Sequence, residues 1–387
     1  MLAEGMGLAS VSTHICSPHP FALRANFMEC DLLIADLLKF IAADEPSDAA
    51  FDTLAQTVFA YQFAHNQPFA KFSKARGKTP RTVKTWMDIP AVPINAFKTL
   101  DLTCCLPSDS AAVFMTSGTT LGGLRGKNYH STLSVYDTSM RRNFAERVML
   151  GQDKIDMGIL FPTPRIMPNS SLAHYLNLAV QTFATPESGH LIGEDSINFD
   201  RLIAQLTRAE TTGQPYALLG ASFSLVHALD ELQRLGKTFC LPEGSWILDT
   251  GGFKGQSREL ELNEFYDALS HTLGVPRAQC INMYGMTELS TQFYDRGNDV
   301  CPSIKSGPHW IRTRVVNPLT GVAVAKGETG VLAHTDLANF NSVMTLLTED
   351  SGIATDAGFV LLGRAAGAQA QGCSMAVDEF LKAAASA

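Results

Sequence analysis

A loop rich in small polar residues carries the clearest potential for chemistry in this sequence. Between Thr116 and Gly126 it contains four hydroxyl side chains and four glycines, with the cations Arg125 and Lys127 at its end. Glycines let a backbone approach a ligand closely, and consecutive N–H groups, hydroxyls and cations can surround phosphate oxygens. The loop is not the Gly-x4-Gly-Lys-Ser/Thr loop of kinases and GTPases, because no glycine precedes Gly126 by five residues. It predicts phosphate binding, but a flexible surface loop has the same composition.

A second polar motif follows a short apolar run, Cys280 to Met283, that predicts a strand. It reads Tyr284-Gly285-Met286-Thr287-Glu288 and combines an aromatic ring, a glycine, a hydroxyl and a carboxylate. A strand end followed by a helix N-cap at Thr287 explains the same residues without any ligand. This motif alone therefore does not establish ligand binding, and its interpretation depends on the other motifs of the chain.

These two motifs and three later ones resemble, in the same order, those of the adenylate-forming superfamily, which includes acyl-CoA synthetases, firefly luciferase and peptide-synthetase adenylation domains. The phosphate loop of that superfamily usually reads Thr-Ser-Gly-Thr-Thr-Gly-x-x-Lys-Gly. Here Leu121 resembles a one-residue insertion and Arg125 stands in place of the lysine. The resemblance implies that ATP phosphates are bound by Arg125 and by five residues that match the loop: Thr116, Ser117, Gly118, Thr119 and Thr120.

The resemblance also implies a role for the second motif in nucleotide binding. Tyr284 would face the adenine, with Gly285 allowing close approach beside Met286. Thr287 would hydrogen-bond the α-phosphate, and Glu288 would be the ligand for Mg²⁺.

The three later motifs lie towards the C-terminus. Gly327–Leu332 resembles the Gly-Glu-x-Gly-Glu-Leu hairpin of the superfamily. Asp350 stands where a carboxylate binds the ribose hydroxyls, and Arg364 where an arginine marks a hinge and contacts the nucleotide. Only 23 residues follow Arg364, with Lys382 as their one lysine. We therefore expect the typical lid domain, which carries a catalytic lysine, to be missing.

Three further stretches are similar to the acyl-protein synthetase family, the long-chain-fatty-acid–luciferin-component ligases of bacterial bioluminescence. They are Asp249–Gly255, Ser170–His174 and Gly363–Ser374. That family activates a fatty acid with ATP, transfers the acyl group to a cysteine near its own C-terminus, and delivers it to a partner reductase. The resemblance adds four candidates: Gly251 and Gly252 for nucleotide binding, and Lys254 and His174 for catalysis. A solvated lysine and a packed or capping histidine are the alternatives.

Cys373 is the cysteine that the resemblance assigns to acyl transfer. It follows a small and polar stretch, Gly367 to Gly372, that we expect to be mobile. It precedes Ser374, which can cap a short helix, and a thiol at a helix N-terminus is favoured as thiolate. The alternative is a tail cysteine that packs on the domain.

Composition narrows the class of protein. Of the 387 residues, 45% are hydrophobic and 18% charged, which is typical of a globular protein with a large core. A net charge of −8 argues against nucleic acid as a partner, and no basic leader or long apolar run predicts a signal peptide or membrane span. Eight cysteines without a Cys-x-x-Cys pair argue against zinc and disulfides, so we expect a cytoplasmic protein with reduced thiols.

The periodicity predicts the elements that would position these residues. Apolar spacing predicts helices at 27–42 and near 51–59, and the chain from 156 to 283 then alternates strands with helices. This alternation favours an α/β fold, a parallel or mixed sheet covered by helices, with ligands at the carboxyl ends of the strands. The run Ala111–Met115 predicts a buried strand before the phosphate loop.

We predict four segments: a helical portion at 1–90, an α/β core with both nucleotide motifs at 91–309, a β-hairpin subdomain at 310–364, and a mobile tail at 365–387. The leading hypothesis for function is an acyl-protein synthetase using ATP and Mg²⁺. An acyl- or aryl-CoA ligase of the phenylacetate type and a non-catalytic nucleotide-binding relative are the alternatives.

Overall fold

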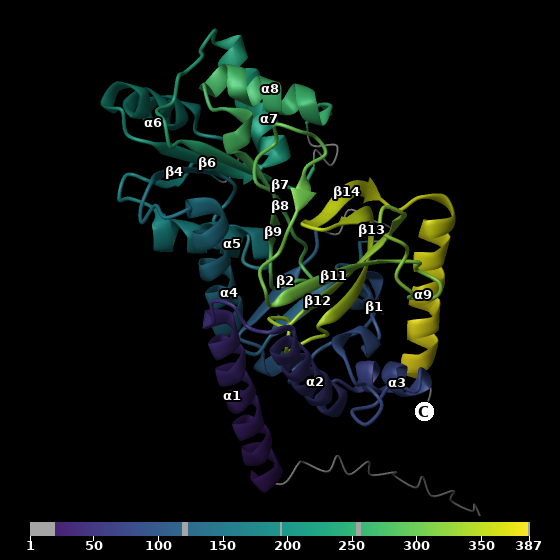
Figure 1. The fold of residues 1–387 in the computed structure, drawn as a ribbon. Helices are drawn as coiled ribbons and strands as arrows, with labels where there is room; N and C mark the ends of the chain where they lie inside the picture. The colour runs from purple at the N-terminus through teal and green to yellow at the C-terminus, as the bar shows by residue number, and fades with distance from the viewer. Residues whose placement is uncertain (1–19, 118–122, 194–195, 253–256, 386–387) are drawn as a thin grey trace, which may run out of the picture.

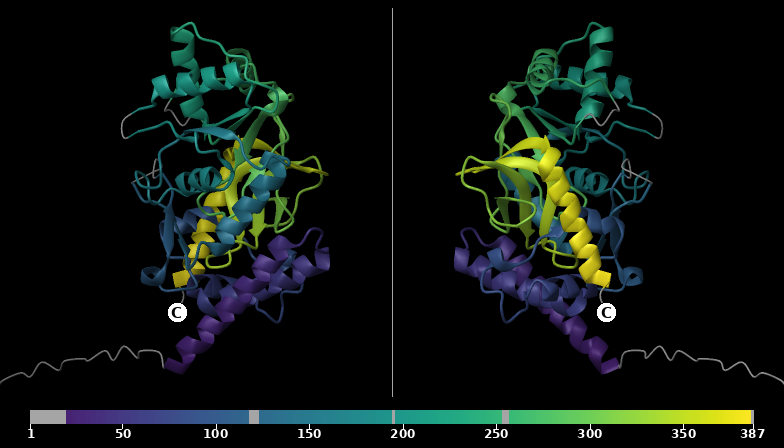
Figure 2. Two further views of the ribbon diagram at one scale, coloured as in Figure 1. Left: turned by 90° about the vertical axis from the view of Figure 1, so that its left-hand side faces the viewer. Right: turned by 90° about the vertical axis from the view of Figure 1, so that its right-hand side faces the viewer.

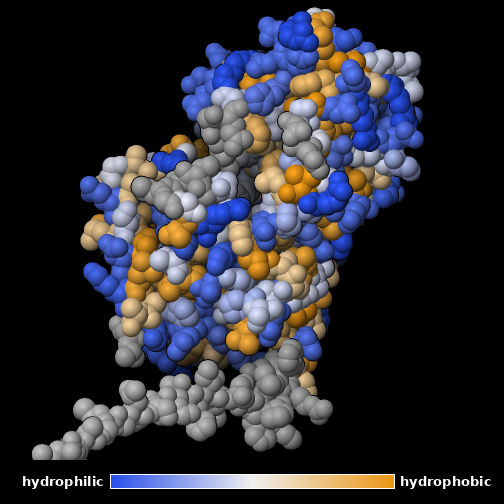
Figure 3. Space-filling model, turned by 180° about the vertical axis from the view of Figure 1, so that it is seen from behind, coloured by the Kyte–Doolittle hydropathy of each residue, from blue (hydrophilic) through white to orange (hydrophobic). Residues whose placement is uncertain are grey.

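The computed structural model describes residues 20–117, 123–193, 196–252 and 257–385 (Figure 1). It contains two six-stranded sheets and a two-stranded hairpin, with helices packed around them. Among the described residues, no helix is both long enough and apolar enough to cross a membrane. Seen from behind, the surface mixes hydrophilic and hydrophobic residues over both the upper and lower parts of the molecule (Figure 3).

Three helices form the N-terminal portion: α1 (Pro20–Ala42), α2 (Asp48–His65) and α3 (Gln67–Ala75). Ser47 caps α2 by accepting a hydrogen bond from the backbone of Ala50 at 3.2 Å. The predicted apolar stripe of α2, from Phe51 to Phe59, is buried in the largest hydrophobic core. Short 3-10 turns at Trp86–Asp88, Ile94–Lys98 and Pro107–Asp109 lead towards the next strands.

The first large sheet has the strand order β5-β4-β6-β7-β8-β9. Its strands are β4 (Asp156–Leu160), β5 (Gly189–His190), β6 (Tyr216–Ala221), β7 (Trp246–Thr250), β8 (Cys280–Tyr284) and the antiparallel edge strand β9 (Phe293–Tyr294). Helices α4 (Ser134–Phe144) and α5 (Ser171–Phe183) cover one face, and the other is covered by α6 (Phe199–Thr212), α7 (Ser222–Arg234) and α8 (Leu262–Leu273). The predicted strand–helix alternation is confirmed.

The second large sheet gathers strands from distant parts of the chain. Its order is β10-β14-β13-β12-β11, with β1 (Val92–Pro93) parallel to β13. The strands are β10 (Ile304–Lys305), β11 (Ile311–Val316), β12 (Thr329–Asp336), β13 (Thr345–Thr355) and β14 (Gly358–Arg364). Because side chains alternate along strands, one face joins the core of the N-terminal helices and the other forms a smaller apolar cluster.

A C-terminal helix, α9 (Gly367–Ala385), covers that smaller cluster. Figure 2 shows α9 running along the second sheet and reaching the N-terminal helices. Phe380 is fully buried against Phe72 of α3, with ring centroids 4.7 Å apart. The expectation of a helix that starts at Ser374 is therefore wrong, because one continuous helix begins at Gly367 and packs on the sheet.

The strand before the phosphate loop also differs from its prediction. β2 (Ala112–Met115) pairs only with β3 (Lys127–His130), in an antiparallel hairpin outside both large sheets. Of its four residues, Phe114 alone is fully buried. A four-residue apolar run has the same appearance whether it lies in a sheet or in a hairpin.

Candidate nucleotide and acyl-transfer site

Thr116 closes the base of the phosphate loop. Its backbone N–H donates to the Gly126 carbonyl at 3.0 Å, and its hydroxyl accepts from the Gly126 N–H at 2.9 Å. The Arg125 guanidinium is exposed and donates to the Thr116 carbonyl at 2.6 Å. Ser117 is exposed beside this closure, whereas Gly118, Thr119 and Thr120 lie outside the described residues. The hairpin therefore holds both ends of the loop at fixed positions.

Glu288 is buried against this closure. A Cβ atom at Gly126 would lie 3.3 Å from Glu288 Oε1 and 3.2 Å from Thr116 Cγ2, so the glycine lets the carboxylate approach the loop. Burial raises the pKa of Glu288 to about 7, while Lys98 and Arg364 act to lower it. The structure thus brings the phosphate loop and the second motif, 162 positions apart at Gly126 and Glu288, into contact.

Buried amides fix the backbone on either side of this carboxylate. Asn128 of β3 donates to the Thr287 carbonyl at 3.0 Å, and Asn339 donates to the Glu288 carbonyl at 2.8 Å. Asp336, at the end of β12, accepts from the N–H groups of Ser290 and Thr291, both at 2.9 Å. These partners hold the second motif in an irregular turn, and no helix follows Thr287. Asn128, Asp336 and Asn339 were not predicted from the sequence. Only Asn339 carries a local signal, as a polar residue between apolar neighbours.

Tyr284, the last residue of β8, joins the two large sheets. Its ring is packed against His334 and Phe359 of the second sheet, with centroids 5.7 Å away in both cases. Its hydroxyl donates to Asp350 Oδ2 at 2.8 Å. Burial raises the pKa of Tyr284, so the phenol stays neutral and remains a donor. Next to it Gly285 is exposed, and Met286 packs on the edge of the largest core.

Asp350 and Arg364 lie opposite each other on β13 and β14. Arg364 Nη1 is 3.3 Å from Asp350 Oδ1 and 3.5 Å from Glu349 Oε2. Burial raises the pKa of Asp350, against the lowering effect of Tyr284 and Arg364. The carboxylate and guanidinium predicted to bind nucleotide are thus brought together with Tyr284.

Gly251 and Gly252 leave the first sheet at the carboxyl end of β7, beside Tyr284's strand. Thr250 donates through its hydroxyl to the Met283 carbonyl at 3.0 Å, which ties the ends of β7 and β8 together. Gly251 has φ = 77°, a left-handed conformation that favours glycine. Lys254 lies outside the described residues.

His174 is on α5, beside the base of the phosphate loop. Its ring lies 5.5 Å from Phe114 of β2, and Nε2 is 2.7 Å from Asp137 Oδ1 of α4. The Asn169 amide just before α5 also donates to the Val113 carbonyl at 2.8 Å. The structure therefore places His174 near the loop but in a packed setting, held by an acidic partner.

Cys373 lies on the opposite face of the second sheet from Tyr284. It is 4% exposed in the second turn of α9, with Sγ 3.7 Å from the Thr348 carbonyl. Burial raises the pKa of this thiol to about 11, and Glu349 and Asp350 act in the same direction. The expectation of a mobile thiol with a lowered pKa at a helix start is wrong for this conformation, because the thiol is covered by a packed helix. The cysteine nevertheless neighbours the Asp350 motif across β13.

Within the described ranges, no group of three or more His, Cys, Asp or Glu side chains could hold an ion. Glu288 is the one predicted metal ligand. Mg²⁺ bound to a nucleotide takes one or two carboxylates together with phosphates and water, so a single buried carboxylate beside the phosphate loop fits that ion.

Comparison with solved structures defines the class of fold. The chain is similar to an open conformation of 2-hydroxyisobutyryl-CoA ligase in complex with its acyl-adenylate and CoA, with a TM-score of 0.59, 16% identity, and coverage of 82% of this chain and 74% of that one. It matches the postadenylation state of that ligase with a TM-score of 0.58 and 15% identity over 82% of this chain and 67% of the ligase. The fold is therefore that of the adenylate-forming ligases, as predicted.

Sequence comparison then identifies the family. Residues 25–382 match the family model "Acyl-protein synthetase, LuxE". Two curated relatives named long-chain-fatty-acid–luciferin-component ligase match over 78% of this chain and 78% of their own length, from Vibrio harveyi at 23% identity and from Aliivibrio fischeri at 22%. The chain belongs to the acyl-protein synthetase family, which confirms the predicted resemblance.

Proposed function

We propose that this protein activates a long-chain fatty acid with ATP and carries the acyl group on Cys373 for delivery to a partner reductase. The observation that most strongly supports adenylation is the contact of the phosphate loop with Glu288, beside the Tyr284–Asp350 hydrogen bond. These groups come from three separate parts of the chain and meet at the carboxyl end of β8. The substrate class and the partner are proposed from the names of the two curated relatives.

In the first step, a carboxylate oxygen attacks the α-phosphorus of ATP, and the bond to pyrophosphate breaks. The phosphate loop and Arg125 would hold the phosphates, Asp350 the ribose and Tyr284 the adenine. Mg²⁺ held by Glu288 would neutralise charge on the phosphates. The chain's own contribution is to position the reactants and stabilise charge.

In the second step, the thiolate of Cys373 attacks the acyl carbonyl, the bond to AMP breaks, and the thiol proton passes to solvent. The pKa of about 11 and the burial of this thiol mean that it cannot react where it lies. Helix α9 must leave the sheet for the transfer. Gly363 and Gly367, with φ of 105° and 54°, border the connection from β14 and provide conformational freedom there.

The test of this function is to incubate wild type and Cys373→Ser with ATP, Mg²⁺ and radiolabelled fatty acid. We expect pyrophosphate exchange in both proteins and hydroxylamine-labile label on the wild type alone. Thioester label that persists on Cys373→Ser would move the acyl site to another cysteine. Absence of pyrophosphate exchange from both, with a series of chain lengths, would contradict adenylation.

A second candidate is an acid–CoA ligase, in which free CoA accepts the acyl group. The observation that favours it is the buried, protonated state of Cys373. The same incubation with CoA added would discriminate, because acyl-CoA would accumulate in solution with the Cys373→Ser variant as fast as with the wild type.

A further inference from the structure

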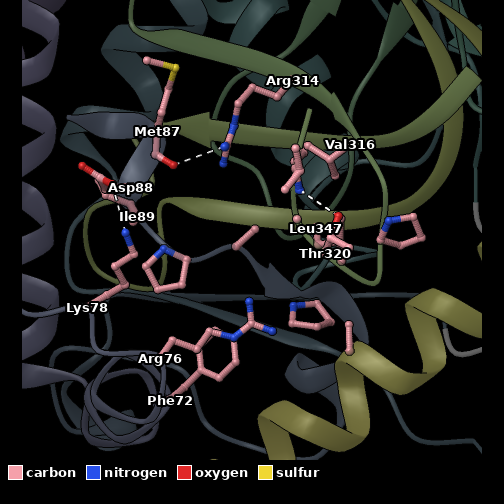
Figure 4. Close-up of a pocket in the computed structure, with 18 of the residues that line it drawn as sticks. Phe72, Arg76, Lys78, Met87, Asp88, Ile89, Arg314, Val316, Thr320 and Leu347 are labelled. Carbon is pink, nitrogen blue, oxygen red and sulfur yellow. Dashed lines mark hydrogen bonds and ion pairs between the residues drawn. The ribbon is translucent and has the colours of Figure 1, made fainter. Parts of the chain in front are cut away.

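A cavity of about 500 Å³ lies between α3, α9 and the second sheet, on the face opposite Tyr284. Figure 4 shows Ile89 on one side of the cavity and Val316 and Leu347 on the other, with Phe72 on a third side. This volume is within the range of small-molecule sites, about 300–1,000 Å³. Of the residues predicted for nucleotide binding, none that the structure describes lines it.

The walls of this cavity also bury Cys373. The apolar cluster around the thiol shares five residues with the cavity lining: Ala91, Val316, Ala333, Leu347 and Ala376. Ala376 lies one helical turn after Cys373 on α9, so both side chains face the same side of the helix. A chain attached to Sγ would enter the cavity directly over these residues.

Most of the charged side chains that line the cavity are paired with one another. Lys78 is 2.9 Å from Asp88, and Arg76 is 2.6 Å from Glu379, so two of the three lining cations are paired with lining carboxylates. The third, Arg314, donates to the Met87 carbonyl at 3.2 Å and lies over the Trp86 ring. Arg314 Nε has no hydrogen-bond partner among the described residues. An occupant would therefore contact apolar walls and polar groups to a similar extent.

We propose that this cavity holds the fatty-acyl chain while it is attached to Cys373 as a thioester, a proposal that rests on the proposed function. Docking of α9 then buries both the chain and the thioester. Burial of the methylene groups of the chain holds the loaded helix in place. The acyl group is thereby protected from water until a partner takes it.

Photo-cross-linking tests the position of the chain. The protein is loaded with ATP, Mg²⁺ and a tetradecanoic acid that carries a diazirine near its methyl end, freed of unbound acid by gel filtration, and illuminated. We expect the thioester on Cys373 and cross-links at Met87, Ile89 or Val322. Thioester on Cys373 with cross-links only near Tyr284 or Phe293 would overturn this inference alone, whereas no thioester on Cys373 would overturn the proposed acyl carrier as well.

A second arm distinguishes an attached chain from a free fatty acid. Cys373→Ser is illuminated with the same acid in the absence of ATP, and no cross-link at the cavity is expected. Cross-links at the cavity as strong as in the loaded wild type would show that it binds free fatty acid. They would overturn the proposal that it holds the chain attached to Cys373.

Filling the cavity gives an independent measurement. In Ala376→Phe the ring occupies space that the chain needs, so we expect the thioester to hydrolyse about tenfold faster, the factor that corresponds to about two methylene groups left unburied. Met375→Phe is the matched control, because Met375 is the preceding residue, is 60% exposed and does not line the cavity. Equal thioester lifetimes in the two variants would contradict the inference.

Discussion

The two faces of the second sheet differ in chemistry although they share the same strands. On one face, Tyr284 and His334 are polar groups buried among aromatic rings, and the partly buried Asp350 accepts a hydrogen bond from Tyr284. On the other, Leu347 and Ala333 pack with Cys373 in an apolar cluster. Adjacent residues of β13 point to opposite faces. Leu346 packs in the core with the N-terminal helices, and Leu347 packs in the small cluster around Cys373.

This difference indicates that the two proposed reactions are separated in time. The first face presents carboxylates and a phenol that suit a nucleotide, and it needs no rearrangement to bring Glu288 to the phosphate loop. The second face keeps its nucleophile protonated and covered by α9. We therefore expect mutations on the first face to change the rate of adenylation, and mutations on the second face to change how easily α9 leaves the sheet.

The largest effect is expected on the first face, from Glu288→Gln. The substitution keeps the shape but removes the proposed Mg²⁺ ligand, so fatty-acid-dependent pyrophosphate exchange should fall by about a hundredfold to a thousandfold. Circular dichroism should show an intact fold. Glu328→Gln, in the exposed turn before β12, is the control and should exchange normally. A normal rate for Glu288→Gln would show that the carboxylate is not part of the adenylation site.

The next effect concerns the second face, where Phe380→Ala should release α9. Phe380 is fully buried, and truncation of such a side chain costs about 3–5 kcal/mol. We expect Cys373 to be alkylated by iodoacetamide at least about a hundredfold faster, measured by mass spectrometry of its peptide, because each 1.4 kcal/mol is about a tenfold change in equilibrium. Met375→Ala, at an exposed position of the same helix, should not change the rate. A slow rate in Phe380→Ala would contradict a releasable helix.

The sequence predicts the first face better than the second. Tyr284, Asp350 and Arg364 are found from local motifs, and the structure brings them together as expected. The contact between Gly126 and Glu288 follows from the motif set but not from either motif alone. Asn128 and Asn339 could not be predicted, because a buried amide is recognised only when its long-range partners are known.

On the second face, local sequence signals were insufficient to predict helix α9 and the burial of Cys373. The stretch from Gly367 to Gly372 begins and ends with glycine, whose local propensity disfavours a helix at both positions. Tertiary packing overrides it: Gly372 lies against Pro318, where a Cβ atom would approach Cγ to 2.7 Å. The buried position of Cys373 follows from the contact of Gly372 with Pro318 and from the packing of Phe380 against Phe72. Phe380 and Phe72 are about 300 positions apart in the sequence.

The pH dependence of Cys373 alkylation tests whether α9 protects the thiol. Burial raises the pKa of Cys373 from 9.0 to about 11, so the docked state retains the thiol proton that an exposed thiol loses above pH 9. Docking is therefore unaffected below pH 9 and weakens as pH rises from 9 towards 11. We expect alkylation of Cys373 in the wild type to increase up to about pH 11, whereas Phe380→Ala should level off near pH 9. Identical midpoints would mean that α9 does not protect the thiol.

The smallest effect is expected from the ion pair at the edge of the second face. Arg76 Nη2 is 2.6 Å from Glu379 Oε2, but both side chains are partly exposed, at 31% and 54%. Such pairs contribute about 0.2–1 kcal/mol, so Arg76→Gln should raise the rate of Cys373 alkylation by less than about sixfold. Salt should shrink the difference, because it screens exposed charges. The matched control is Arg234→Gln, which breaks the exposed Arg234–Glu231 pair on α7 and should leave the rate unchanged. An increase as large as that of Phe380→Ala would show that charge, and not the apolar face, holds α9 on the sheet.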